Sequence, residues 1–191
     1  YYINPWINEN LNLDGALGPL RGDFFCMPFG ANSEAWQDEK HPGHGEVAGG
    51  AWRMREASSA NGELNICLEM NTNVRKGKII KQITLIDGQN VIYSRHQIVG
   101  MSGSMPLGHH AILAIPEKPG STLVSVGEFD LGMTNPGWFS RPENGAAQAL
   151  ALGATFNNLT QVPTLDGGVT DCSTFPARPG FDDLLCVMKR D

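Results

Sequence analysis

Apolar and polar residues alternate with a period of two along several stretches of the chain. In residues 64–70 the even positions are apolar and most odd positions are polar, as in a half-buried β-strand. Residues 78–86 are rich in isoleucine, and β-branched side chains favour strands. The turn-forming residues 87–90 separate this stretch from a similar one, residues 91–98. The pattern predicts an antiparallel hairpin with a four-residue connection.

Further strands are predicted at residues 51–56, 110–115, 122–129 and 184–188. Helical periodicity is nearly absent, and only residues 145–152, rich in alanine and leucine, predict a short helix. Segments rich in glycine and proline at 27–50, 100–108 and 134–145 predict long loops. Many short strands with such connections indicate an all-β fold, a sandwich or a barrel.

Composition narrows the class of protein. The chain has 191 residues, of which 41% are hydrophobic, enough for a sizeable core. This length and the absence of a linker or repeat predict one domain over residues 1–191. The net charge of −6 and the lack of a basic tract argue against nucleic acid as a partner. No apolar run approaches the roughly 18 residues of a membrane helix, so no membrane partner is expected.

The four cysteines, Cys26, Cys67, Cys172 and Cys186, are scattered along the chain. No two of them form a C-x-x-C pair, which leaves a zinc ribbon or a dithiol redox motif unsupported. Cys67 and Cys186 lie in strand-like apolar stretches, where we expect them to be small buried side chains. A reducing, cytoplasmic location is the expectation.

Histidines cluster at two places. His41, His44 and Glu46 share one glycine-rich segment, and His109 and His110 are adjacent before an apolar run that predicts a strand. Histidine is suited to moving protons near neutral pH. These residues can equally be solvated loop side chains, or supply ligands to a metal ion. An H-x-x-H pair in a loop lacks the helix that aims both rings at one point in H-E-x-x-H, so proton transfer ranks above metal binding.

A third feature is Arg21, which precedes Gly22 and Asp23 and is followed by the turn Pro28-Phe29-Gly30. A guanidinium there can bind an oxyanion or sugar hydroxyls, or form a surface ion pair with Asp23. Tryptophans beside loops can stack on sugar rings or cover the core; they are Trp6, Trp36, Trp52 and Trp138.

Other catalytic patterns are missing. Asp182 and Asp183 are adjacent, so on a strand they would point to opposite faces and could not flank one glycosidic bond. The sequence has no Gly-x-Ser-x-Gly, phosphate-binding loop or dinucleotide fingerprint.

Taken in order along the chain, these motifs resemble the aldose 1-epimerase (galactose mutarotase-like) superfamily. They are Leu20-Arg21-Gly22 with Pro28-Phe29-Gly30, then His44-Gly45-Glu46 ahead of Trp52, and then His109-His110. The resemblance covers residues 17–115 and is nearest to hexose-6-phosphate-type and uncharacterised members. It implies an antiparallel β-sandwich, the mutarotase supersandwich, which binds a sugar or sugar phosphate and interconverts its α and β anomers without metal or cofactor.

The resemblance also implies roles for single residues. His110, or its neighbour His109, would be the acid on the ring oxygen. His44 would bind and orient the sugar, Arg21 would contact hydroxyls or a phosphate, and Glu46 and Trp52 would belong to the substrate-binding segment.

The sequence departs from the family pattern in its catalytic base. The family's base is a glutamate in the C-terminal third, in a context that does not occur before Asp191. The chain is therefore expected to be the N-terminal and central part of a longer protein. Two alternatives stay open: a non-catalytic carbohydrate-binding β-sandwich, and a metal-dependent β-barrel enzyme with the histidine clusters as ligands.

Overall fold

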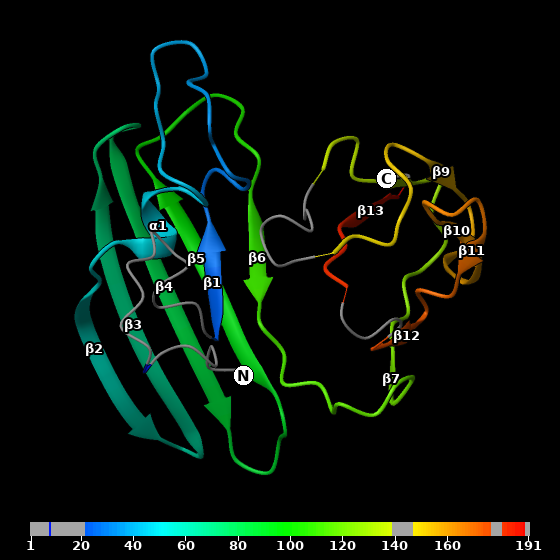
Figure 1. Cartoon of the computed structure of the whole chain (residues 1–191). Coiled ribbons are helices and arrows are strands. Elements are labelled where there is room, and N and C mark those ends of the chain that lie inside the picture. The colour runs from blue at the N-terminus through cyan, green and yellow to red at the C-terminus, as the bar shows by residue number, and fades with distance from the viewer. Residues whose placement is uncertain (1–7, 9–21, 139–146, 177–180, 190–191) are drawn as a thin grey trace. The chain divides into compact units, whose positions relative to one another are not determined.

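The computed structural model describes residue 8 and residues 22–138, 147–176 and 181–189 (Figure 1). The fold is all-β with antiparallel sheets, as the alternation predicts. The chain divides into two compact units, one ending at Leu113 and the other beginning at Ala114. The described elements of the first unit are β1 (Asp23–Cys26), α1 (Glu46–Gly49), β2 (Arg53–Ala60), β3 (Glu63–Thr72), β4 (Gly77–Ile86), β5 (Ile92–Val99) and β6 (Gly108–Ala111).

A four-stranded sheet of consecutive hairpins, in the order β2-β3-β4-β5, is the largest element of the first unit. Asn61 and Gly62 connect β2 to β3 with φ of 53° and 76°, as a tight two-residue hairpin turn requires. The predicted hairpin over residues 78–98 is confirmed by β4 and β5, which pair from Lys78↔Val99 to Leu85↔Ile92.

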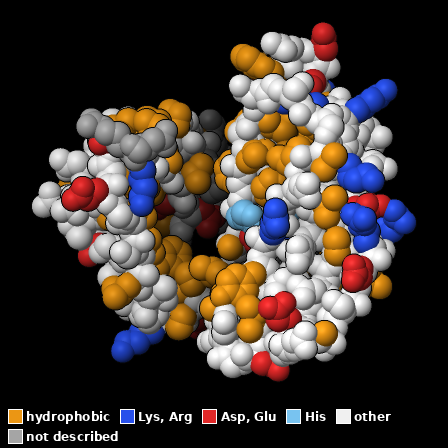
Figure 2. All heavy atoms as spheres, turned by 180° about the vertical axis from the view of Figure 1, so that it is seen from behind, with side chains coloured by type: hydrophobic (Ala, Val, Ile, Leu, Met, Phe, Trp, Pro, Cys, Tyr) orange, Lys and Arg blue, Asp and Glu red, His pale blue; other side chains and the backbone are white. Residues whose placement is uncertain are grey.

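The two faces of this sheet differ in polarity. The face that carries Met70 and Ile79 holds the apolar even positions of β3 and odd positions of β4. On the opposite face, the carboxylate of Glu69 pairs with three cations, those of Arg53, Arg55 and Lys78. In the right-hand part of Figure 2, Lys and Arg side chains lie among Asp and Glu side chains, with hydrophobic side chains scattered between them.

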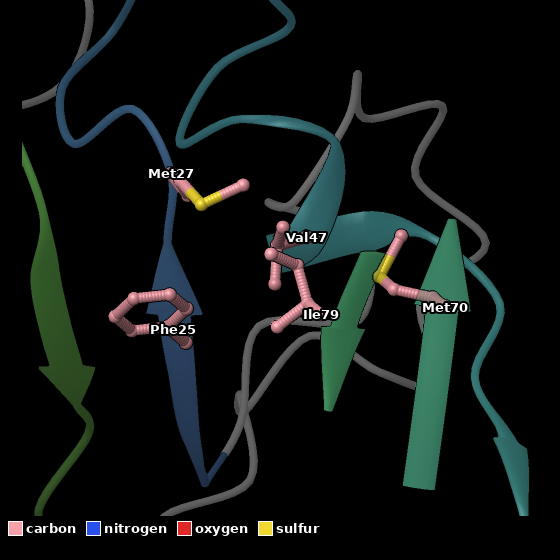
Figure 3. Close-up of a cluster of buried hydrophobic side chains, with 5 residues drawn as sticks. All are labelled: Phe25, Met27, Val47, Met70 and Ile79. Atoms are coloured by element: carbon pink, nitrogen blue, oxygen red, sulfur yellow. The ribbon is translucent and has the colours of Figure 1, made fainter. Parts of the chain in front are cut away.

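A two-stranded ribbon of β1 and β6 lies over the apolar face of the sheet (Figure 1). The core between them contains Phe25 and Met27 from the β1 segment, Val47 from α1, Met70 from β3 and Ile79 from β4. Figure 3 shows Met27, Val47, Ile79 and Met70 gathered between the β1 segment and β3, with Phe25 on β1 beside them. Ile79 is fully buried, so the packing of the ribbon on the sheet removes the centre of this apolar face from water.

Two local predictions in the first unit need correction. The strand expected at residues 110–115 is β6, Gly108–Ala111, which begins two residues earlier and contains His109 as well as His110. It ends at Ala111 because its partner β1 begins opposite, at Asp23. The loop before Trp52 contains a single helical turn, α1.

The second unit is built from short antiparallel strands around its own core of Leu150, Phe156, Leu159 and Val162. Its elements are β7 (Thr122–Leu123), β8 (Leu131–Thr134), β9 (Thr155–Phe156), the 3-10 helix η3 (Leu159–Gln161), β10 (Val162–Pro163), β11 (Val169–Thr170), β12 (Thr174–Phe175) and β13 (Leu185–Met188). The strand predicted at residues 184–188 is confirmed as β13, whereas only the first two residues of the stretch 122–129 form a strand.

The helix predicted at residues 145–152 is wrong over its described part, residues 147–152; residues 145 and 146 lie outside the described residues. The backbone amides of Ala149 and Leu150 donate to the carboxylate of Asp183 at 3.0 and 2.8 Å. Leu150 also forms a β-bridge with Thr164. These distant partners satisfy the backbone groups that a helix would have paired locally.

The four cysteines are free thiols. The prediction that both Cys67 and Cys186 are buried is wrong for Cys186. Cys26 is fully buried, Cys67 is half-buried, and Cys186 is exposed. In the described part of the chain, no helix is both long enough and apolar enough to cross a membrane.

Candidate histidine site

The tandem histidines of β6 point to opposite sides of the ribbon, because successive side chains on a strand alternate. His110 lies opposite Phe24 of β1, and His109 lies opposite Phe25. Phe25 faces the four-stranded sheet, where it belongs to the core. We call the side with Phe25 and His109 the sheet-facing side, and the side with Phe24 and His110 the outer side.

Two histidines meet on the outer side of the ribbon. The ring of His110 stacks on Phe24, with centroids 4.7 Å apart and an interplanar angle of 11°. His44 lies edge-on to His110, with ring centroids 5.2 Å apart. Phe24 and Phe29 each contact the His44 ring edge-on at 5.7 Å. The predicted residues His44 and His110 are therefore brought together from positions 66 residues apart in the sequence (110 − 44), between two phenylalanine rings.

The backbone of the loop before α1 aims His44 at the ribbon. His44 has φ of 59° and Gly45 has φ of 80°, a left-handed pair that turns the chain sharply. The His44 amide donates to the Gly30 carbonyl at 2.8 Å, and the Met27 amide donates to the His44 carbonyl at 3.1 Å. His44 is thus held on both sides by backbone hydrogen bonds to the segment that follows β1.

The surroundings of His44 favour its neutral form. Partial burial, and after it the charge on His110, lower the pKa of His44 below its usual value. The two imidazoles are close enough that a proton on one disfavours a proton on the other. The neutral ring of His44 is therefore available to accept a proton.

A buried thiol lies beneath His44. The Sγ atom of Cys26 is 3.6 Å from Nδ1 of His44, and burial, with a smaller effect of Asp23, raises the pKa of Cys26 to about 11. Cys26 is also fully buried. A protonated thiol without access to solvent is a poor nucleophile, so the arrangement does not describe a Cys-His nucleophilic pair.

A second group of titratable side chains lies on the sheet-facing side. Nδ1 of His109 is 3.1 Å from Oδ2 of Asp23. The His109 ring is 5.1 Å from that of His96 on β5, which stacks on Phe25 at 4.3 Å. Burial, followed by the charges on Lys81 and His109, lowers the pKa of His96 to about 4. His96 is therefore neutral near pH 7, while His109 is paired with a carboxylate.

Trp52 belongs to this second group. Its ring is 6.4 Å from that of His96, and Nζ of Lys81 lies 5.9 Å from the indole centroid. Burial lowers the pKa of Lys81, with Asp23 acting in the opposite direction. An ammonium over an indole is a favourable cation–π arrangement. The sheet-facing group is thus a packed polar cluster between the ribbon and the sheet.

The residues predicted to form one site occupy different places. His44 and His110 converge on the outer side, whereas His109 and Trp52 are in the sheet-facing group. The carboxylate of Glu46 accepts from the backbone amides of Asn73 and Val74 at 2.9 and 3.0 Å, which ties α1 to the β3–β4 turn. Arg21, predicted to contact substrate, lies outside the described residues.

Four residues beside these histidines were missed by the sequence interpretation. Phe24, Cys26 and Phe29 surround His44, and His96 stacks on Phe25. For His96 a signal existed, because it shares the alternation of Ile92 and Ile98 and so faces the apolar side of the sheet. The others depend on the pairing of β1 with β6, which nothing local in the sequence reveals.

The residues predicted as candidate metal ligands do not come together at one place either. His41 pairs with Glu39, with Nε2 and Oε2 3.0 Å apart, away from the His44–His110 pair. Among the described residues, no group of three or more His, Cys, Asp or Glu side chains is arranged to hold a metal ion.

No protein-family model matches this chain, and no curated protein or solved structure matches it. The function proposed below rests on the resemblance and on the histidine site itself.

Proposed function

We propose that the protein binds an aldose at the His44–His110 pair and interconverts its α and β anomers. This is the reaction of the mutarotase-like enzymes that its sequence resembles, with His44 in place of the glutamate base of that family. The observation that carries the proposal is the edge-to-face contact of these two imidazoles, with ring centroids 5.2 Å apart. The two-layered packing of the ribbon on the sheet is consistent with the sandwich architecture implied by the resemblance.

Anomer interconversion needs one acid and one base. In the proposed reaction, protonated His110 donates its proton to the ring oxygen while neutral His44 accepts the proton of the anomeric hydroxyl. The bond between the anomeric carbon and the ring oxygen breaks, and the free aldehyde forms. Rotation about the adjacent carbon–carbon bond and reversal of both proton transfers close the ring on the other face. Each histidine regains its starting state, so no cofactor is consumed.

The aromatic rings complete the proposed site. Phe29 is 45% exposed, so its face is available to the apolar side of a sugar ring. A free sugar or a sugar phosphate both fit this proposal, with Arg21 as the predicted phosphate contact.

The same aromatic rings favour a second candidate, a non-catalytic carbohydrate-binding module. Phe24 and Phe29 flank His44, and aromatic rings beside polar groups suffice to hold a sugar without turnover. The two candidates differ in one measurable property, the rate of anomer interconversion.

Polarimetry on freshly dissolved α-glucose, α-galactose and α-glucose 6-phosphate tests turnover directly. We expect the wild-type protein to accelerate equilibration of at least one of them. Replacing a positioned acid or base lowers such rates by about 100-fold or more, so His110→Gln and His44→Gln should each abolish most of the acceleration. His109→Gln is the matched control, because His109 is adjacent in sequence but lies on the sheet-facing side.

Three outcomes separate the hypotheses. Loss in His110→Gln with retention in His109→Gln supports the proposed reaction. Sugar binding without acceleration, detected by saturation-transfer NMR, supports the binding module. Equal rates in wild type and His110→Gln contradict the catalytic role of the pair.

A further inference from the structure

The first unit contains a second candidate binding site, a pocket of about 510 Å³ that neither His44 nor His110 lines. Its walls include Trp36, Asn32 and Met105, and its polar groups include Glu39, His41 and Arg75. The volume lies within the range of small-molecule sites in proteins, which are mostly apolar with a few fixed polar groups.

A tight turn places an aromatic ring and a carboxylate side by side in this pocket. Trp36 and Glu39 form an antiparallel bridge in which each amide donates to the other's carbonyl at 3.0 Å. Gln37, between them, has φ of 52°, which the reversal of the chain requires. Residues directly opposite in an antiparallel pair project to the same face, so the indole of Trp36 and the carboxylate of Glu39 emerge together. Trp36 is 73% exposed, so its indole is open to contact with a ligand.

The polar groups of the pocket are fixed by their own hydrogen bonds. Nε and Nη2 of Arg75 donate to the two carboxylate oxygens of Glu39 at 2.9 and 2.8 Å. Nη1 of Arg75 donates to the carbonyl of Ser104 at 3.1 Å, and Nε2 of His41 is 3.0 Å from Oε2 of Glu39. A bidentate pair of this kind holds both partners in one orientation, so the pocket presents preformed donors and acceptors.

The charge of the pocket disfavours an anionic ligand. The guanidinium of Arg75 is neutralised by Glu39, and Glu34 adds a second carboxylate to the lining. An anion entering the pocket would therefore meet uncompensated negative charge. Sugars suit such a site, because one face of a pyranose carries C–H groups that pack on an indole, while its hydroxyls both donate and accept hydrogen bonds.

We propose that this pocket binds a neutral pyranose, with its apolar face on Trp36 and its hydroxyls on the Glu39–Arg75 pair. The site is separate from the His44–His110 pair, and the inference shares with the proposed function only the class of ligand.

The pocket and the histidine pair are built on the same two loops. Pro28 lines the pocket, and its neighbour Phe29 contacts His44. The side-chain amide of Asn32 donates to the carbonyls of Pro28 and Pro42 at 3.3 and 2.8 Å, which joins the loops. A sugar on Trp36 is therefore either a separate monosaccharide or a further unit of an oligosaccharide whose end reaches His44.

Binding of defined sugars tests the inference without requiring turnover. Methyl β-glucopyranoside and methyl β-galactopyranoside are locked anomers that cannot be interconverted, and maltotriose and cellotriose represent oligosaccharides. Titrations followed by calorimetry and saturation-transfer NMR would use the wild type, Trp36→Ala, Trp36→Phe and His110→Gln. Trp138→Ala is the matched control, because Trp138 is also partly exposed, at 47%, but belongs to the second unit.

We expect at least one of these sugars to bind the wild type, with a dissociation constant raised about 10-fold by Trp36→Ala, since loss of one aromatic contact has about this effect. Trp36→Phe and Trp138→Ala should bind as the wild type does, and His110→Gln should retain the binding that Trp36→Ala loses. Trp36 is largely exposed, so its replacement is expected to leave the fold intact, and far-ultraviolet circular dichroism checks this.

The inference is overturned if Trp36→Ala binds as tightly as the wild type, if binding is lost in His110→Gln alone, or if none of the four sugars binds. Tighter binding of a trisaccharide than of either methyl glycoside, dependent on Trp36, identifies the ligand as an oligosaccharide; equal affinities identify a single sugar unit. Binding that depends on Trp36 in a protein without anomer interconversion leaves this inference standing and removes the proposed function.

Discussion

Gly45 is the position at which the fold and the histidine site depend most directly on one residue. It follows His44, has φ of 80° and ψ of 167°, and forms a parallel bridge with Met27 at the end of β1. A Cβ atom at Gly45 would lie 1.9 Å from the carbonyl oxygen of Met27 and 2.8 Å from the nitrogen of Pro28. Both are backbone atoms, so no side-chain rotation relieves the clash.

The expected cost of Gly45→Ala has two parts. The backbone conformation is one that essentially only glycine adopts, at a cost of about 1–3 kcal/mol for another residue. The clash then requires the loop to move away from β1, which breaks the hydrogen bond between the Met27 amide and the His44 carbonyl, worth about 1 kcal/mol. Together these lower the free energy of unfolding by about 3 kcal/mol.

Urea unfolding followed by circular dichroism measures this loss. Gly43→Ala is the matched control, because a Cβ there would meet only the Ala31 carbonyl oxygen at 3.5 Å, an ordinary contact. We expect the control to change the free energy of unfolding by about 0.5 kcal/mol or less. A nuclear Overhauser effect between the His44 and His110 rings should be present in wild type and Gly43→Ala and lost in Gly45→Ala. A loss below about 1 kcal/mol in Gly45→Ala, or equal losses in both variants, would refute the reasoning.

Three further predictions concern titratable groups. The pKa of His96 is about 4 in the folded protein, against 6.5 ordinarily, so the unfolded chain binds more protons between these pH values. The free energy of unfolding should therefore fall by about 2 kcal/mol from pH 6.5 to pH 4, allowing for the partial exposure of His96. Urea unfolding of His96→Gln should show a weaker dependence on pH. Hydrogen bonds from Arg75, and after it His41, lower the pKa of Glu39 to about 2. Carboxyl NMR titration should find the pKa of Glu39 raised toward its ordinary value in Arg75→Met and raised less in Arg75→Lys. An unchanged pKa in Arg75→Met would contradict the assigned cause. Burial raises the pKa of Cys26 to about 11, so in the native protein a thiol reagent at pH 8 should label exposed Cys186 at least 10-fold faster than Cys26. If Cys26 is labelled as fast as Cys186, and no faster after unfolding, the thiol of Cys26 is accessible to the reagent.

The four-stranded sheet was predictable because its information is local. Alternation in β3 and β4 identifies the apolar face without reference to the rest of the chain, and the turn that follows β4 is visible as a cluster of polar and glycine residues. The helix predicted at residues 145–152 failed for the opposite reason. The preference of alanine and leucine for helix is weak per residue, and the carboxylate of Asp183, more than 30 residues away, pairs with the amides of that stretch.

The candidate site could be predicted only in part. His44 and His110 were recognised by residue type and resemblance, but their contact depends on β1 pairing with β6 and on the left-handed turn at Gly45. The separation of His109 from His110 follows from strand alternation once β6 is known to begin at Gly108. With the strand predicted to start at His110, the two histidines could not be assigned to different sides.

The pairing of β1 with β6 also bears on the order of folding. The strands of the four-stranded sheet are neighbours in sequence, so each hairpin closes a short loop, whereas Asp23 and His109 are 86 residues apart. Closing a long loop costs more chain entropy and slows formation of the contacts that depend on it. The sheet can therefore form first and serve as the template on which the ribbon docks. In that order of events, the contact between His44 and His110 forms in the last step. A chain in which the two rings are in contact has therefore already folded the rest of this unit.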